Sequence, residues 1–140
     1  MRYVLDMNEE QANIVDKALE LYTRLRIGQW RELLDLCVPL SDEDYCKKSD
    51  ALIPVLLEAR QIPYPELTSN PGHSFGVGKF EDADLAWEVH EVLRNKMAWT
   101  RHPEGGNGVN FYPPTSFRGN ELAKCTAVPE SADTDKSEKS

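Results

Sequence analysis

The chain has 140 residues, of which 40% are hydrophobic and 29% are charged, and its formal net charge is −8. This length predicts one globular domain with room for a core, which we place at residues 1–128. The acidic balance argues against non-specific binding to nucleic acid or to an anionic membrane, because both need clustered Lys and Arg. It is compatible with a basic protein partner, or with a small ligand held at one local basic spot.

The cysteines and the apolar runs indicate a cytoplasmic protein. Cys37, Cys46 and Cys125 are odd in number and show no C-x-x-C spacing, so they predict reduced thiols and neither a disulfide framework nor a zinc site. The N-terminus does not read as a signal peptide. The longest apolar run, Ala51 to Leu57, is far shorter than a membrane span.

A first helix is predicted from Glu9 to Ile27. Asn8 is a suitable N-cap, and Gln11 completes a pattern typical of a capping box. Gly28 is a natural residue to end the helix. An apolar stripe at helical spacing supports this assignment: Ile14, Val15, Ala18, Leu19, Leu21, Tyr22 and Leu25.

Two further helices are predicted from Gln29 to Leu36 and from Asp42 to about Gln61. Pro54 lies inside the second of them, so we expect a kink or a break near residues 50–53.

The fourth predicted helix begins near Glu81 or Asp82 and runs to about Trp99. Acidic residues crowd its first half and basic residues its end, an order that complements the helix dipole. Its expected core stripe is Leu85, Ala86, Val89, Val92, Leu93 and Met97.

After this helix the residue pattern allows two short strands, at Val109–Tyr112 and Leu122–Val128, either of which could pair with residues 3–7. The polar tail, 129–140, is expected to be disordered. The predicted fold is therefore a mainly α, compact domain of about four helices, with room for a minor β-hairpin and with a disordered acidic C-terminal tail.

A glycine-rich stretch, Gly72-His73-Ser74-Phe75-Gly76-Val77-Gly78-Lys79, is the most distinctive motif. It is not a Walker A loop. His73 stands where that motif requires its first glycine, Phe80 stands where it requires a hydroxyl, and no apolar strand precedes it. Acidic residues after the loop also disfavour phosphate at the start of the next helix.

Two interpretations of this loop carry equal weight. In the first, Phe75, Val77 and Phe80 close the loop over the core and its role is structural. In the second, His73, Ser74 and Lys79 contact a ligand or a partner.

A second candidate cluster is Trp99, Arg101 and His102, which could hold an aromatic ring and a phosphate. Trp30 and Trp87 more often signify packing than a stacking platform. The three histidines form no H-E-x-x-H pattern, so the sequence predicts no metal site. We also expect no cofactor and no catalytic residue.

Two stretches resemble a group of small proteins from phages and prophages of Gram-positive bacteria. They are ALELYTRLRIGQW at 18–30, and GHSFGVG at 72–78 leading into DADLAWEV at 82–89. The likeness extends over roughly 8–125, and it is most specific in the glycine-rich stretch. It brings no catalytic residues, but it implies a phage protein that counters host immunity in the host cytoplasm.

From these observations we expect a non-enzymatic binding protein that sequesters a nucleotide-derived signalling molecule, with a pocket that could be shared across a homo-oligomer. The alternative is an acidic inhibitor that binds a host defence protein directly. A catalytic degrader of a nucleotide is the least favoured.

Overall fold

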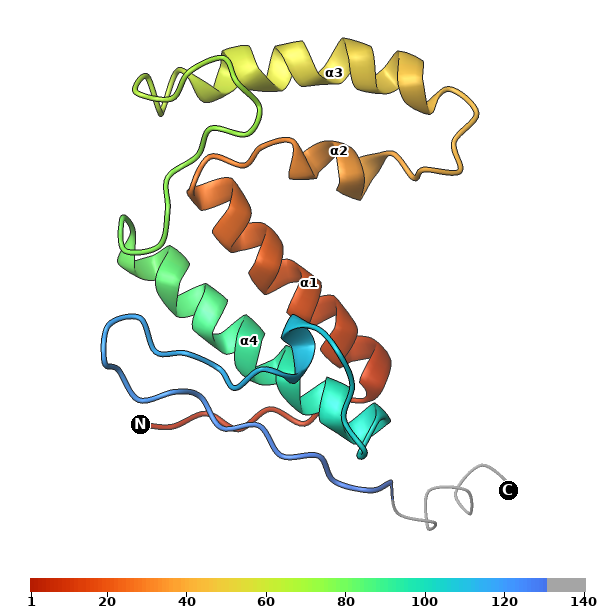
Figure 1. Ribbon diagram of the computed structural model, residues 1–140, viewed down its shortest axis with the longest axis vertical. Helices are drawn as coiled ribbons and strands as arrows, with labels where there is room; N and C mark the ends of the chain where they lie inside the picture. The colour runs from red at the N-terminus through yellow and green to blue at the C-terminus, as the bar shows by residue number, and fades with distance from the viewer. Residues whose placement is uncertain (131–140) are drawn as a thin grey trace.

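A computed structural model describes residues 1–130 and contains four α-helices (Figure 1). They are α1 (Glu9–Arg26), α2 (Glu32–Cys37), α3 (Tyr45–Arg60) and α4 (Glu81–Arg101), followed by one turn of 3-10 helix, η1 (Val109–Phe111). No β-strand occurs within residues 1–130. The prediction of a mainly α fold with about four helices is confirmed.

The body of the molecule is the packed pair α1 and α4, which lie side by side (Figure 1). Small side chains allow the close approach: Ala12 on α1 and Ala83 and Ala98 on α4 are buried. The segment after η1 runs back along α4 (Figure 1). Helix α2 and helix α3 form a separate arm at the end of α1, and α2 is the one helix that α3 contacts among the described residues.

Helix α1 begins and ends as its sequence predicts. The Asn8 side chain accepts a hydrogen bond from the backbone of Gln11, and the Gln11 side chain accepts one from the backbone of Asn8. At the other end, Gly28 has a φ of 93°, and the N–H groups of Gly28 and Gln29 bond the carbonyls of Leu25 and Arg24 in a Schellman motif.

Because Gly28 and Gln29 form the turn that ends α1, α2 begins at Glu32 and not at Gln29. Helix α3 also begins later than expected, at Tyr45, because Asp42 forms a turn in which its side chain accepts from the Asp44 N–H and pairs with Lys48. Of the kink or break expected at residues 50–53, the break is wrong. Helix α3 runs through Pro54, and Asp50, whose carbonyl loses its helical partner there, is exposed where water can replace it.

The expected minor β-hairpin is also wrong, because polar side chains of α4 bond the backbone that would have joined a sheet. Asn95 donates to the carbonyls of Asn110 and Tyr112. Glu91 accepts from the N–H of Thr115, and Glu88 accepts from the N–H of Phe117. The tail prediction for 129–140 lies, from residue 131 onward, outside the described residues.

The core face of α4 differs from the predicted stripe. Leu85 is 52% exposed, whereas Asp84, Glu88 and His90 are buried. Helix α4 is covered by α1 on one side and by the C-terminal segment on another, so polar residues that contact that segment are buried too.

Candidate functional site

The glycine-rich loop is held to the body by a buried arginine. Arg60, 1% exposed at the end of α3, donates to four backbone carbonyls, those of Gly28, Thr68, Asn70 and His73. Burial lowers the pKa of its guanidinium. One cation thus joins the turn after α1 to the start of the loop.

His73 and Ser74 have structural partners in this loop. The Nδ1 atom of His73 accepts the N–H of Thr68 at 2.9 Å, and Ser74 Oγ accepts from Gln29 Nε2 at 3.3 Å. The N–H of Phe75 bonds the carbonyl of Ile27 at 2.8 Å.

The aromatic residues of the loop pack inward, as the structural interpretation predicts. Phe75 and Phe80 lie edge to face, with ring centroids 5.4 Å apart, and both contact Tyr64. Val77 does not share in this packing and is 63% exposed. Lys79 is exposed, and its ammonium lies 5.3 Å from the Phe75 ring.

The second predicted cluster lies at the other end of α4. Trp99 packs on Phe111 and donates to its carbonyl. Arg101 pairs with Glu9 of α1 at 2.6 Å, and His102 is exposed beside Glu104. All of these residues surround the C-terminus of α4.

The predicted site residues therefore form two groups within one chain. His73, Ser74 and Lys79 precede α4, while Trp99, Arg101 and His102 follow or end it. An α-helix of this length spans roughly 30 Å, so one small ligand cannot contact both groups in a single chain.

An open pocket of about 390 Å³ lies where α1, the start of α2 and the start of α4 meet. Its lining is largely apolar, and its residues are Tyr22, Leu25, Arg26, Trp30, Leu33 and Asp82. The volume is within the usual range for small-molecule sites, which combine apolar walls with a few polar groups.

The polar rim of this pocket is a connected set of three side chains. Asp82 accepts from the hydroxyl of Tyr22 at 2.7 Å and from Nε of Arg26 at 3.0 Å. Arg26 also donates to Tyr64 and lies over the Phe80 ring, 3.8 Å from its centroid. The rim is thereby attached to the aromatic packing under the loop.

These contacts alter the titration of all three groups. The hydrogen bond to Asp82 raises the pKa of Tyr22 above its usual 10.0, and the same bond lowers the pKa of Asp82 below its usual 3.8. The bond to Tyr64 raises the pKa of Arg26. The contribution of Tyr22 to stability is present below pH 10.0 and is lost as pH rises through its raised pKa. The contribution of Asp82 is present above pH 3.8 and is lost as pH falls through its lowered pKa.

Replacing Tyr22 by Phe should raise the pKa of Asp82 toward 3.8, because the largest of its stabilising hydrogen bonds is removed. The Arg26 bond remains, so the pKa should stay below 3.8. Carbon-detected NMR titration of the Asp82 carboxyl in both proteins measures this change, with Asp42 as an internal control whose partner is Lys48. An unchanged titration of Asp82 would contradict the assigned hydrogen bond.

Sequence reasoning did not find this pocket. Tyr22 and Arg26 are one turn apart on α1, which is a detectable pairing, and Trp30 follows the helix-ending glycine. Asp82, however, was explained by the helix dipole alone. Nothing local indicates that it meets residues of α1, since that contact depends on how α1 packs against α4.

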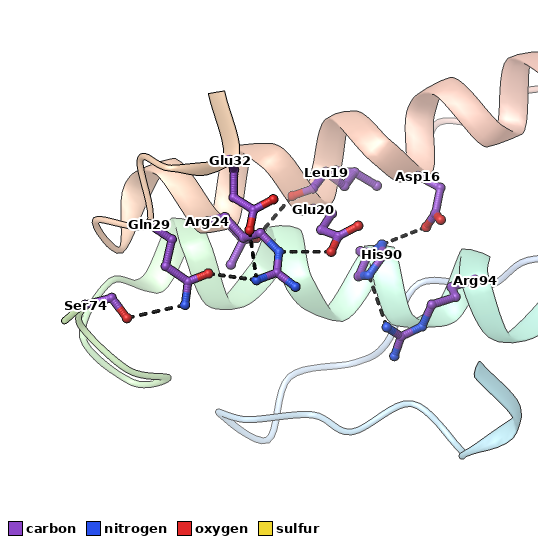
Figure 2. A network of polar contacts seen from close by, with 10 residues as sticks. Asp16, Leu19, Glu20, Arg24, Gln29, Glu32, Ser74, His90 and Arg94 are labelled. Atoms are coloured by element: carbon purple, nitrogen blue, oxygen red, sulfur yellow. Dashed lines mark hydrogen bonds and ion pairs between the residues drawn. The ribbon is translucent and has the colours of Figure 1, made fainter. Parts of the chain in front are cut away.

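A second polar network lies between α1 and α4 (Figure 2). Buried His90 bonds Asp16 through Nδ1 at 2.7 Å and faces Arg94 through Nε2 at 3.4 Å. The guanidinium carbons of Arg24 and Arg94 each lie 5.8 Å from the Trp87 ring centroid.

Figure 2 also shows Arg24 in contact with Glu20, Gln29 and Glu32. Trp87 thus has two cationic neighbours, and it donates to Glu91 through Nε1. Trp87 therefore lies between two packed helices with cations and a carboxylate around it, which supports its interpretation as a packing residue. The Nε atom of Arg94 is buried and has no hydrogen-bond partner among the described residues.

Within residues 1–130 there is no group of three or more His, Cys, Asp or Glu residues placed to hold a metal ion. None of the helices in that part of the chain is both long and apolar enough to cross a membrane. Comparison with models of protein families, with curated proteins and with solved structures finds no match to this chain.

Proposed function

We propose that this chain is a non-enzymatic binding protein that captures a small nucleotide-like ligand in the pocket between α1, α2 and α4. The observation that carries the proposal is the composition of that pocket. Tyr22 and Trp30 offer aromatic surface to a flat ring, and Arg26 and Asp82 offer a cation and an acceptor at the rim.

The rim offers one group for the base or ribose of such a ligand and another for its phosphate. A carboxylate accepts hydrogen bonds from the amino group of a base or from a ribose hydroxyl. Arg26 supplies the cation that a phosphate needs, and Lys79 on the adjoining loop is a second, exposed cation. The carboxylate accepts hydrogen bonds from both the phenol and the guanidinium, so the rim is held in place by its own side chains.

In this proposal the biological role is that of a phage protein that counters host immunity by sequestering a nucleotide-derived signal. The support for this role is the resemblance of the glycine-rich stretch and its neighbours to small phage and prophage proteins. Its site of action would be the host cytoplasm.

The alternative is an inhibitor that binds a host defence protein directly. The net charge of −8 and the exposed side chains of Leu36, Leu40 and Ile62 favour it, because a basic partner with an apolar patch would complement them.

A release experiment separates these functions. The purified protein is incubated with an extract that contains nucleotide signals, free ligand is removed, and the protein is denatured by heat. Release of intact nucleotide supports sequestration, whereas recovery of altered nucleotide only would indicate an enzyme. Nucleotide that stays free, with inhibition seen only when the host effector is present, would indicate direct protein binding.

Filling the pocket should abolish capture without unfolding the protein. Leu33→Trp replaces an aliphatic side chain of the pocket lining by a bulkier indole ring, and we expect the retained nucleotide to fall at least about tenfold, which corresponds to roughly 1.4 kcal/mol. Ile14→Trp, at a 66% exposed position of α1 outside the pocket, is the matched control and should retain wild-type capture. Native mass spectrometry counts bound ligand for each protein. Equal capture by Leu33→Trp and wild type would remove the pocket from the proposal.

A further inference from the structure

Helix α3 carries an apolar sequence that the single chain does not cover. Residues 51–57 form an unbroken apolar run, and a helix that is apolar on all sides normally lies in a core. Here no residue of that run is buried, and Val55 is 60% exposed. Helix α2 covers one side only, and α3 is at the outer edge of the molecule (Figure 1).

The total surface of the chain is large for its mass. It exposes 10501 Å², whereas a compact monomer of 15.9 kDa exposes roughly 7,400 Å². After an allowance of roughly 1,500 Å² for residues 131–140, which lie outside the described part of the chain, an excess of about 1,600 Å² remains. A standard protein–protein interface takes roughly 800 Å² from each partner. The excess is shared among α3, the exposed residues Met1 to Leu5 and the segment after η1.

The uncovered face of α3 is complementary to itself. Lys48, Ala51, Val55 and Glu58 recur at spacings of three and four residues, so they form one exposed stripe along the helix. If a second α3 lies antiparallel on this stripe, Ala51 lies opposite Val55 of the partner subunit at the centre. In the same register Lys48 lies opposite Glu58 of the partner subunit at each end.

This arrangement has the features that a two-fold interface requires. The central residues are small and apolar, which permits close approach of the two helices. The opposite charges occur twice by symmetry, and a parallel arrangement would instead place Lys48 beside the partner's Lys48. Lys48 pairs with Asp42 in the single chain, and its side chain is 51% exposed, so it is accessible to a second partner.

We propose that the exposed stripe of α3 is a dimer interface, and that its occupant is the α3 of a second copy of this chain in antiparallel orientation. The α2–α3 arm then carries the dimer contact, while the pocket of the proposed function stays on the side where α2 meets α1. The interface does not depend on that function.

Charge reversal tests the register. Lys48→Glu alone sets like charges opposite each other at both ends, and Glu58→Lys does the same, so each should weaken dimerisation at least about tenfold. The double variant Lys48→Glu/Glu58→Lys restores opposite charges and should return the dimer dissociation constant to near the wild-type value. Sedimentation equilibrium over a concentration series measures these constants, with circular dichroism to establish that each variant is helical.

Two further variants test the centre of the stripe. Val55→Asp places a charge against an apolar contact twice per dimer and should give a monomer. Ile14→Asp, at an exposed position of α1, should remain dimeric as the control. A wild-type protein that is monomeric at every concentration would overturn the proposal, and so would a double charge reversal that fails to restore the dimer.

Discussion

Replacing Arg60 by Ala should destabilise the protein by about 3 to 5 kcal/mol, the largest effect of any single substitution that we expect. The change removes hydrogen bonds to four backbone carbonyls, and it takes the side-chain donor away from the buried carbonyl of Gly28 and from the part-buried carbonyls of Thr68 and His73. The Asn70 carbonyl keeps the His73 N–H as a donor. Bonds from a charged donor contribute about 1.5 to 3 kcal/mol each, but such contributions overlap within one network. Urea unfolding followed by circular dichroism measures the loss.

Two variants distinguish the hydrogen-bond geometry from charge alone. Arg60→Lys keeps the cation but cannot reach four carbonyls from one planar group, so it should lose more than half of the same stability. Arg31→Ala, at an exposed position before α2, should change stability by less than about 0.5 kcal/mol. A small effect of Arg60→Ala, comparable to that of Arg31→Ala, would contradict the role assigned to Arg60.

Replacing Asp84 by Ala should release Arg118 and the Gly78 N–H from α4 and cost about 2 to 4 kcal/mol. Asp84 is 4% exposed, and its carboxylate accepts from the N–H of Gly78 at 3.0 Å and from Nε of Arg118 at 2.8 Å. Arg118 also donates to the carbonyl of Gly78. Only the Asp84 side of this pair is buried, but removing it also takes the acceptor from the Gly78 N–H, which is why the cost exceeds that of a surface ion pair.

A double-mutant cycle with Arg118→Ala isolates this pair. Because the two side chains are in direct contact, their interaction energy should be about 1 to 3 kcal/mol. Lys48 and Asp42, a more exposed pair in a turn, provide the comparison and should couple by less than about 1 kcal/mol. Amide hydrogen exchange adds a local measurement: Asp84→Ala should accelerate exchange at Gly78 and at Phe117. Additive effects of the two alanine substitutions would contradict the pairing.

The acidic residues of α4 have a structural role that their sequence pattern does not indicate. Asp84, Glu88 and Glu91 could be explained by the helix dipole or by acid–base chemistry. In the folded chain they accept hydrogen bonds from the backbone of Gly78, Thr115 and Phe117. They therefore hold two loops against α4, and the carboxylates are occupied by that task.

The glycine-rich loop is likewise held in place by contacts with residues distant in the chain. Its residues were equally consistent with a closing loop and with a ligand loop, and the contacts of Phe75, Phe80 and Arg60 account for its shape. Lys79 is the predicted residue of this loop that most clearly presents a free charged group to solvent. A ligand role for this loop therefore depends on Lys79 more than on His73 or Ser74.

The sequence by itself determined that there are about four helices, and it determined both ends of α1. Helix ends depend on signals that act within a few residues, so they can be recognised in the sequence alone. Examples are the capping pair Asn8 and Gln11, the turn at Gly28 and the charge order of α4. Pro54 predicted a kink or a break because it has no N–H to bond the Asp50 carbonyl. Asp50 is exposed, so water can bond that carbonyl and the helix continues without a break.

Only the tertiary structure decided the pocket, the buried polar networks and the uncovered face of α3. The bond from Tyr22 to Asp82, the four carbonyls at Arg60 and the pair of Asp84 with Arg118 join residues far apart in the chain. Such contacts depend on the packing of α1 against α4 and on the path of the loops, and no local pattern encodes either. The physical reason is that side-chain periodicity determines which face of a helix is apolar, whereas the element that packs on that face depends on the tertiary arrangement of the whole chain.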